Sequence, residues 1–354
     1  SKMRPNIKTL AIIICLFCSF TGQGQDYYKA AYNHSGDSLK FRLNQIIKNH
    51  TEFPYTSSST DVWDILKETD RDENDSDNVI LIYSGRSVNA AQEYNSAKGW
   101  SREHVWAKSR GDFGTDEGAG TDVHHLRPCD VSVNSTRNNR NFDDCITCKE
   151  VIDGGFNTGS NTDINLWTFE PPDEVKGDVA RMIFYMVIRY EGEGLEPDLE
   201  LTNILLDNTD KSSLQGVKST LLKWHRNDAV SDWERNRNEI IYKDYQKNRN
   251  PFIDYPELSE FLFGDSTGYV WKPEIIFGTN ETKTERYNVY PNPTKDSVNI
   301  EGDFTKLTVI NSFGQVLNIK QSKKISLERY PSGVYYFLFS NGTDFVERYT
   351  VTKE

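Results

Sequence analysis

Hydrophobic positions along the chain predict a mixed domain of helices and strands. Within residues 37–50, apolar side chains recur at the three- and four-residue spacing of an amphipathic helix. Residues 179–190 are apolar almost all round, which predicts a buried helix. A Ser-Asp-Trp-Glu capping box at 231–234 predicts a helix that continues to about residue 246, and the apolar run at 79–83 predicts a strand.

A change of pattern at residues 264–285 predicts a domain boundary. This stretch is rich in Gly, Thr, Lys and Pro with little periodicity, whereas short alternating segments follow from residue 287. We therefore expect an α+β main domain followed by a small all-β sandwich. The predicted division into signal peptide, main domain, linker and C-terminal domain is 1–25, 26–275, 276–287 and 288–354.

The first residues have the pattern of an export signal. An apolar run at 10–20 follows Arg4 and Lys8 and precedes small and polar residues. The run is shorter than the roughly 20 residues that cross a bilayer. We expect a chain that passes through the periplasm, has no membrane span, and ends up secreted or at the cell surface.

Three cysteines remain after the predicted signal: Cys129, Cys145 and Cys148. In an oxidising compartment three thiols allow one disulfide with one cysteine left over, and the sequence leaves the pairing open. The alternative is a zinc site made by the three cysteines with His124. Secretion favours the disulfide.

Composition limits the classes of partner. The chain has 41 Lys and Arg against 53 Asp and Glu, a formal net charge of −12, and 36% of its residues are hydrophobic. The hydrophobic fraction excludes a wholly disordered chain, and the negative charge excludes a protein coated with basic residues for nucleic-acid binding. A polyanion must therefore meet a local basic patch.

Residues 100–142 hold the candidate chemistry. Residues 100–106 and 121–127 predict two short strands joined by a Gly- and Asp-rich loop, and Asp130 is placed to cap a following helix. On that helix Asn134, Arg137, Asn138 and Asn141 would share one face. A strand, loop, strand and helix in this order would aim polar residues at one point.

These residues suit metal-assisted hydrolysis of a phosphodiester. Glu103 and Asn134 offer the oxygen ligands that one Mg²⁺ prefers. His104 is suited to act as the base for water, and Arg137 or Arg140 could stabilise charge on the phosphate. Because neighbours on a strand face opposite sides, Glu103 and His104 can converge only if the strand ends or bulges there.

Further arginines are candidates for contacts with the substrate backbone. Arg102 and Arg127 lie in the two predicted strands, and Arg235 and Arg249 belong to a basic stretch late in the chain. The neighbouring His124 and His125 are expected to support the second strand and not to act in catalysis.

Three separated blocks resemble the bacterial endonuclease I family of secreted nucleases. They are the run from Trp100 to Trp106, the run from Thr121 to Pro128 with Asn134 to Asn141, and the run from Asn248 to Asp254. The resemblance covers residues 27–269. It implies a ββα-metal, or His-Me finger, fold in which His104 is the general base and Glu103 and Asn134 hold magnesium. The implied reaction is non-specific hydrolysis of DNA, and often RNA too, to 5′-phosphate products.

The chain departs from that family in having few cysteines, which leaves the family's disulfides and any exact arginine role without a counterpart.

The C-terminal part is similar to a sorting domain of the type IX secretion system. Residues 289–293, 311–316 and 327–339 carry this second resemblance, which implies a β-sandwich that serves as an export signal.

Taken together, these features predict a secreted, magnesium-dependent endonuclease. Its expected partners are nucleic acid as substrate and the type IX secretion machinery, and we expect a monomer. Two alternatives stay open at this point: a surface binding module or adhesin, and a metal-dependent phosphodiesterase acting on small esters. An adhesin has no need for a base beside a hard-metal site, and dependence on substrate length would separate the phosphodiesterase.

Overall fold

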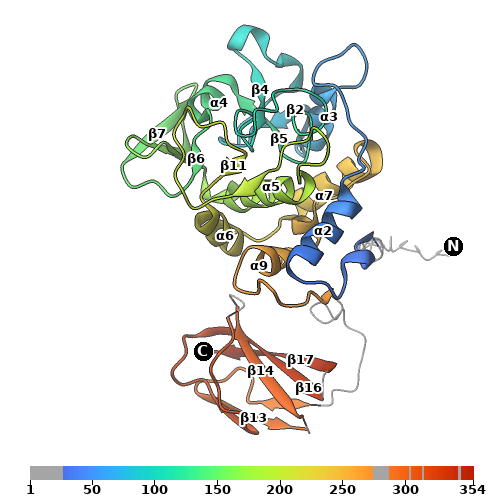
Figure 1. Ribbon diagram of the computed structural model, residues 1–354. Coiled ribbons are helices and arrows are strands. Elements are labelled where there is room, and N and C mark those ends of the chain that lie inside the picture. The colour runs from blue at the N-terminus through green and yellow to red at the C-terminus, as the bar shows by residue number, and fades with distance from the viewer. Residues whose placement is uncertain (1–26, 274–286, 303, 313–314, 342–343) are drawn as a thin grey trace, which may run out of the picture.

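The computed structural model describes residues 27–273, 287–302, 304–312, 315–341 and 344–354 (Figure 1). The predicted signal peptide and almost all of the predicted linker lie outside these residues. The described chain has a mixed part with helices and strands, followed by a C-terminal part made of strands.

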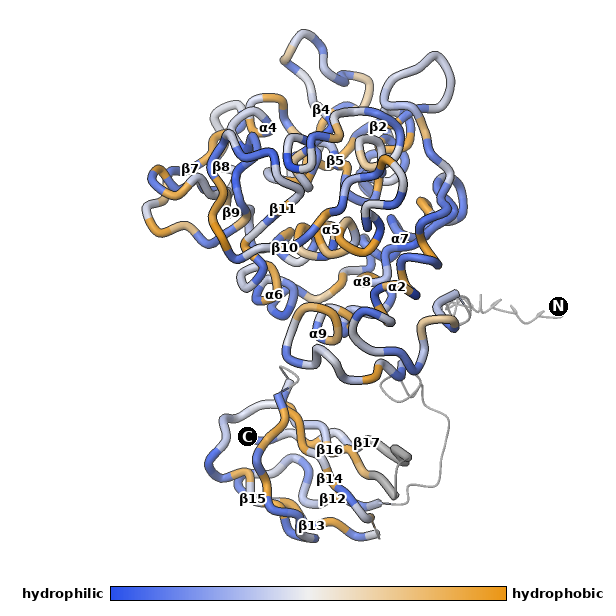
Figure 2. The backbone as a smooth tube through the Cα atoms, viewed as in Figure 1, coloured by the Kyte–Doolittle hydropathy of each residue, from blue (hydrophilic) through white to orange (hydrophobic). Residues whose placement is uncertain are grey.

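A buried helix forms the centre of the mixed part. Helix α5 (Lys176–Arg189) is buried from Gly177 to its end, as the apolar run predicts. Helices α2 (Gly36–Ile47), α6 (Lys218–Asn227) and α8 (Pro251–Asp254) pack against it. In Figure 2 hydrophobic segments gather around α5, which lies in the main hydrophobic cluster. The predictions for α2 and α5 are confirmed.

The predicted capping box starts helix α7 (Asp232–Ile240). The Ser231 hydroxyl accepts from the Glu234 amide at 3.2 Å, and the Glu234 carboxylate accepts from the Ser231 amide at 2.8 Å. The helix continues as a π-helical turn, η5 (Ile241–Tyr245), so the predicted end near residue 246 is confirmed. The remaining helices of this part are α3 (Val62–Thr69), α4 (Val131–Arg137) and α9 (Leu258–Leu262), with short 3₁₀ turns at Lys29–Ala31, Ala90–Gln92, Asn95–Ala97 and Asp173–Val175.

Four small sheets surround these helices. One joins β1 (Arg71–Asp72), β2 (Asp75–Ile80) and β3 (Ser87–Asn89), and another joins β4 (Trp100–His104) and β5 (Leu126–Asp130). A four-stranded sheet has the order β6-β9-β8-β7, with bounds Asn141–Phe142, Thr168–Glu170, Phe156–Asp163 and Cys148–Asp153. Strands β10 (Glu200–Leu201) and β11 (Leu214–Gln215) pair in parallel.

Two strand predictions need correction. The strand predicted at 79–83 ends at Ile80, because the chain turns at residues 82–84 and the Ile82 amide donates to Pro128. The strand predicted at 121–127 is mostly a turn, and β5 begins only at Leu126. The carboxylate of Asp122 accepts from the His124 amide at 2.9 Å and its carbonyl accepts from the His125 amide at 3.2 Å, which closes the turn.

The C-terminal part has two three-stranded antiparallel sheets. One has the order β12-β13-β15 (Asn288–Tyr290, Ser297–Glu301, Lys324–Ser326) and the other β14-β16-β17 (Lys306–Asn311, Gly333–Asn341, Asp344–Lys353). Buried side chains from both sheets, including Val298 and Phe337, form one hydrophobic cluster. This all-β region agrees with the alternating pattern seen in the sequence.

Candidate active site

The central unit of the site is the β4–β5 hairpin followed by α4 (Val131–Arg137). Strands β4 and β5 are antiparallel, with Glu103 opposite Arg127. Asp130 ends β5 and caps α4, because its carboxylate accepts from the amides of Ser132 at 2.8 Å and Val133 at 3.1 Å. The strand, loop, strand and helix thus occur in the predicted order.

The helix is shorter than the sequence predicts. Asn134 and Arg137 lie on α4, but Asn138 has a φ of 52° and ends the helix, and Asn141 belongs to β6. A left-handed residue at this position is a common way for a helix to stop. The predicted four-residue face is therefore reduced to its first half.

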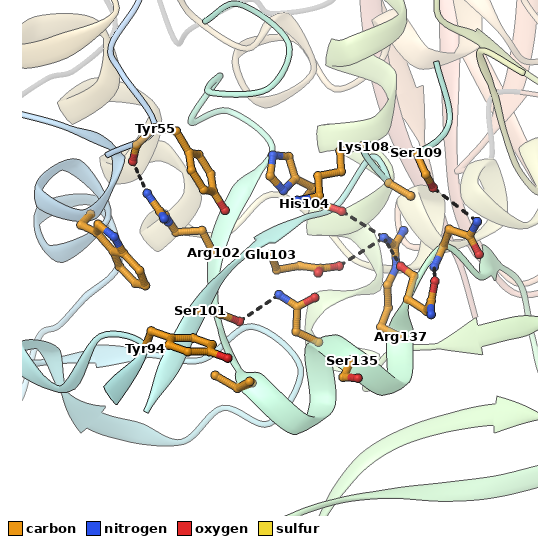
Figure 3. Close-up of a pocket in the computed structure, with 16 residues that line it drawn as sticks. Tyr55, Tyr94, Ser101, Arg102, Glu103, His104, Lys108, Ser109, Ser135 and Arg137 are labelled. Carbon is orange, nitrogen blue, oxygen red and sulfur yellow. Dashed lines mark hydrogen bonds and ion pairs between the residues drawn. The ribbon is translucent and has the colours of Figure 1, made fainter. Parts of the chain in front are cut away.

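A cleft of ≈ 550 Å³ opens between β4, α4 and the segments around Tyr55 and Ser109 (Figure 3). Of the predicted site residues, the structure brings five together here: Arg102, Glu103, His104, Asn134 and Arg137. Strand β4 ends at His104. Its last two residues can therefore line the same cleft although their side chains point in different directions, as Figure 3 shows.

Glu103 is a buried acid, 2% exposed, with one engaged oxygen. Its Oε1 accepts the Tyr83 hydroxyl at 2.9 Å and lies 3.4 Å from Nη1 of Arg137. Burial raises the pKa of Glu103 to about 7, against the opposing effects of Arg137 and of Tyr83. Within the described residues, Oε2 has no hydrogen-bond partner and is open to a ligand.

Asn134 supplies the second oxygen. Its Nδ2 donates to the Ser101 hydroxyl at 3.0 Å, which orients the amide and leaves Oδ1 without a partner in the described chain. One carboxylate oxygen and one amide oxygen lining the same cleft are a donor set that suits a hard divalent cation. A cation there would also offset the cost of keeping Glu103 ionised.

His104 is held in one tautomer. Its Nε2 lies 2.9 Å from the Gly120 carbonyl, which only accepts, so Nε2 carries the proton of the neutral ring. Nδ1 is then the accepting nitrogen, and it has no partner within the described residues. Burial, with His125 as a further contributor, holds the pKa of His104 well below its usual value. The imidazole is therefore neutral at pH 7, with Nδ1 as its accepting nitrogen.

Only glycine fits at position 120, because there is no room for a side chain. A Cβ there would come within 2.5 Å of the Asp116 carbonyl, so a larger residue would displace the carbonyl that holds His104. The adjacent Ala119 carbonyl accepts a hydrogen bond from Nε2 of His125 at 2.8 Å, and Nδ1 of His125 accepts one from the Trp106 amide at 3.3 Å. Both nitrogens of His125 are thus used by the fold.

Arg137 ties the end of β4 to α4. Its Nη1 donates to the His104 carbonyl at 3.0 Å and its Nη2 to the Val105 carbonyl at 2.6 Å. The residue is 1% exposed, and its guanidinium lies over the Phe142 ring. In this arrangement Arg137 positions the backbone of His104 and neutralises Glu103, and it does not present a free pair of donors to a substrate.

Several residues of the cleft, among them Tyr55, Trp63 and Tyr94, were not found from the sequence. Arg102 lies between the rings of Tyr55 and Trp63, 3.4 and 4.0 Å from their centroids, and donates to the Tyr55 carbonyl. Lys108 and the half-exposed Tyr94 also line the cleft. Lys108 and Tyr94 lie close to the predicted strand at 100–106, whereas Tyr55 and Trp63 come from a segment more than 35 residues before it.

Four predicted arginines lie elsewhere. Arg127 is buried in ion pairs with Asp70 and Asp178, and Arg249 is paired with Glu239 and Asp254. Arg235 lies on the surface of α7, and Arg140 lies beyond the end of α4 over the ring of Trp167. None of the four lines this cleft, so their predicted contacts with the substrate stay predictions.

The cysteines form a disulfide and leave one thiol. Cys145 and Cys148 are bridged, with their Cα atoms 5.4 Å apart, and Cys129 is a buried free cysteine. Within the described residues, the one group of His, Cys, Asp and Glu close enough to hold a metal is this disulfide pair with Glu170. Because both sulfurs are in the bridge, the alternative zinc site has no support.

The cleft thus combines a neutral imidazole with a carboxylate and an amide oxygen suited to a cation. Such a set of groups is typical of a hydrolase that acts on phosphate esters. The family model for endonuclease I matches residues 35–257, and the model for a secretion system C-terminal sorting domain matches residues 288–353. The chain belongs to the endonuclease I family and is a nuclease.

Curated relatives agree with this assignment. The extracellular ribonucleases of Bacillus subtilis (strain 168) and Bacillus amyloliquefaciens are each 49% identical to the chain, over 239 and 241 residues. These matches cover 67% and 68% of this chain and 78% of each relative. Endonuclease-1 of Buchnera aphidicola subsp. Baizongia pistaciae (strain Bp) is 28% identical over 134 residues, which are 38% of this chain and 46% of that protein.

The sorting domain and the extracellular relatives together identify a protein that is secreted or held at the cell surface. In the part of the chain that the structure describes, no helix has both the length and the apolar character needed to cross a membrane. Nucleases of this family are typically metal-dependent.

Proposed function

We propose that the chain hydrolyses phosphodiester bonds in polynucleotides, with RNA as the principal substrate, by attack of water at the cleft between β4 and α4. The observation that carries this proposal is His104, a buried neutral imidazole whose Nδ1 is free because Nε2 is bound to Gly120. It lines the same cleft as the oxygens of Glu103 and Asn134. The strand, strand and helix order supports the ββα-metal class.

In this mechanism each side chain has one task. Nδ1 of His104 takes a proton from the attacking water while the Gly120 carbonyl keeps the ring in place. Glu103 and Asn134 would hold one Mg²⁺, with Tyr83 and Ser101 fixing the orientation of the two side chains. The cation, when bound, stabilises negative charge that develops on the phosphate. Arg137 keeps the end of β4 in register with α4.

The choice of RNA rests on the relatives. The two Bacillus proteins are named extracellular ribonucleases, and both match this chain at 49% identity. DNA stays a second candidate substrate, because the family model is that of endonuclease I and a water nucleophile does not need the ribose 2′-hydroxyl. A phosphodiesterase for small esters is less favoured, because a cleft of ≈ 550 Å³ with exposed Lys108 and Tyr94 at its wall suits a longer anion.

The C-terminal residues 288–354 serve in this proposal as the signal that the type IX secretion machinery reads. Residues 26–275 form the nuclease domain, and 276–287 join the two. We keep the prediction that the nuclease acts as a monomer.

The test compares His104→Ala with the wild type on RNA and DNA strands of the same sequence, with and without EDTA. General-base assistance is typically worth about 10² to 10⁴-fold, so we expect a loss of that size at every magnesium concentration. His34→Ala, which removes a histidine that precedes α2 and does not line the cleft, is the matched control and should keep full activity.

End-group mapping of the RNA products completes the test. Attack by water with departure of the 3′-oxygen leaves a 5′-phosphate and a 3′-hydroxyl. Products that end instead in 2′,3′-cyclic or 3′-phosphates would contradict the proposed nucleophile. Near-normal turnover by His104→Ala, or activity that survives EDTA, would contradict the proposed site.

A further inference from the structure

A second groove, of ≈ 510 Å³, lies beside the end of α4. Thr136 and Arg140 form its wall on the α4 side, and the four-stranded sheet forms the opposite wall through β7, β8 and the residues before β9. Helix α4 packs against β7 at this place. Since Asn134 and Arg137 of the same helix line the catalytic cleft, one short helix separates the two depressions.

Arg140 is the chemically distinctive residue of this groove. Its guanidinium lies 3.7 Å from the centre of the Trp167 ring, and its Nε donates to the Thr136 carbonyl at 3.0 Å. Among the described residues it forms no ion pair, and neither terminal nitrogen has a hydrogen-bond partner. By contrast, the buried Arg127 and Arg249 are paired with carboxylates.

The other walls leave Arg140 without an internal counter-ion. Asp163 is in the groove, but its carboxylate already accepts the backbone amides of Ile146, Thr147, Asn165 and Leu166. Lys149 and Glu150 are exposed charges of opposite sign at the rim. Ile152 and Ile164 are 48% and 63% exposed, which is unusual for large aliphatic side chains in a groove.

We propose that this groove binds the polynucleotide strand outside the scissile bond, with Arg140 binding one backbone phosphate and Ile152 and Ile164 contacting the attached nucleoside. The inference rests on the proposed function and extends it to a second substrate-binding site. A planar guanidinium that lies over an indole ring, as Arg140 does over Trp167, can present its outer donors in the fork that matches a phosphate. Arg140 follows Asn134 by six residues, which reach at most about 20 Å even when fully extended, a length that a few nucleotides can span.

The experiment measures kcat/KM on single-stranded RNAs of two, four, eight and twenty nucleotides. A dinucleotide contains only the scissile phosphate, so it cannot reach Arg140. For the wild type we expect kcat/KM to rise with length between two and eight nucleotides. Arg140→Gln should lose about 10-fold on the longer strands and nothing on the dinucleotide. Arg140→Lys keeps the charge but loses the paired donors of the guanidinium. Its kcat/KM on the longer strands should lie between those of the wild type and Arg140→Gln.

Salt dependence gives a second readout. Removing one phosphate contact from a single strand should lower the slope of log kcat/KM against log salt concentration by about 0.7. Arg42→Ala is the matched control, because Arg42 is an exposed arginine beside an aromatic ring, Phe41, on the distant helix α2. This control changes the net charge equally and should leave both the length dependence and the slope unchanged.

The outcomes separate the two proposals. If Arg140→Gln folds, as judged by its thermal melt, and keeps the wild-type length dependence and salt slope while His104→Ala is inactive, the groove is not a substrate site. Equal efficiency of the wild type on dinucleotides and long strands would overturn it as well. If His104→Ala stays active, the proposed catalytic site fails, whatever Arg140→Gln does.

Discussion

Glu103 and Asn134 differ in what they offer a cation: one contributes a charge and the other a neutral dipole. Mg²⁺ is held by few protein ligands, so each of them counts. Glu103→Gln removes the only proposed protein charge on the ion, and we expect it to raise the magnesium concentration for half-maximal cleavage by at least about 10-fold. Asn134→Ala should raise it as well and recover less fully in excess metal, since it also removes the contact with Ser101.

The measurement is a magnesium titration of RNA cleavage for the wild type and both variants. Ser132→Ala, in the first turn of α4, is exposed and does not line the cleft, so it is a control for a change in the same helix. An unchanged midpoint with only a lower plateau for Glu103→Gln would show that Glu103 is not a ligand. His104→Ala should differ in kind, losing rate without a shift in the midpoint.

The sequence predicted that Glu103, His104 and Asn134 lie together better than it predicted their neighbours. Glu103, His104 and Asn134 lie within one continuous stretch whose strands and helix can be recognised locally. Tyr83, which fixes Glu103, belongs to an apolar run that indicates only a core position. The ion pairs of Arg127 with Asp70 and Asp178 could not be predicted, because tertiary folding alone brings those carboxylates to it.

At the level of elements, helices with local start signals were predicted correctly. Asp130 and Ser231 each cap the helix that follows them, and such contacts span only two or three residues. The strand expected at 121–127 was wrong because the carboxylate of Asp122 closes a turn and binds the hydroxyls of Tyr185 and Tyr190, at 2.8 and 2.9 Å. Those partners lie on or beside α5, too far along the chain for a local pattern to reveal.

The packing of α6 against α5 makes the domain sensitive to acid. His225 on α6 donates from Nε2 to the Pro256 carbonyl at 2.9 Å, and its Nδ1 faces Arg181 of α5 at 3.4 Å. Burial, reinforced by Arg181, lowers the pKa of His225 to about 4, although Glu234 and Glu260 oppose the shift. The unfolded chain, with an ordinary histidine pKa of about 6.5, therefore binds the proton more readily than the folded one.

Protonation of His225 in the unfolded chain therefore lowers the free energy of unfolding as the pH falls from about 6.5 to 4. Above pH 6.5 it has no such effect. Chemical unfolding between pH 4 and 8 measures this effect. The free energy of unfolding should fall less with decreasing pH for His225→Gln than for the wild type, by up to about 3 kcal/mol at pH 4. His124 and His125 have pKa values lowered to about 4 as well, so part of the decline should remain. Parallel curves for the two proteins would contradict this account.

On the scale of the whole molecule, the described residues form separate hydrophobic clusters. Those of residues 28–271 share no member with the cluster of residues 287–351. A domain with its own core is expected to fold alone. We therefore predict that deletion of 288–354 leaves kcat/KM of the purified nuclease unchanged, within about twofold, and abolishes export from the cell.

Activity assays on purified protein and nuclease assays on culture fractions test this prediction. A point variant in the C-terminal domain that keeps it folded, such as Val316→Thr at a side chain 65% exposed, should behave as the full chain in the activity assay. An insoluble or inactive truncated protein would show that the C-terminal domain is part of the catalytic fold and that the predicted boundary is wrong.

The aromatic support beneath the cleft couples packing to chemistry. Tyr83 holds Glu103 through its hydroxyl, and its ring centre lies 4.8 Å from that of Phe169, which in turn lies 6.3 Å from Phe142, the ring beneath Arg137. Catalytic groups tolerate displacements of only about 0.5 Å. A screen for inactive variants should therefore return Phe142 and Phe169, which never meet substrate, and evolution can repack this part of the core only in ways that leave the carboxylate where it is.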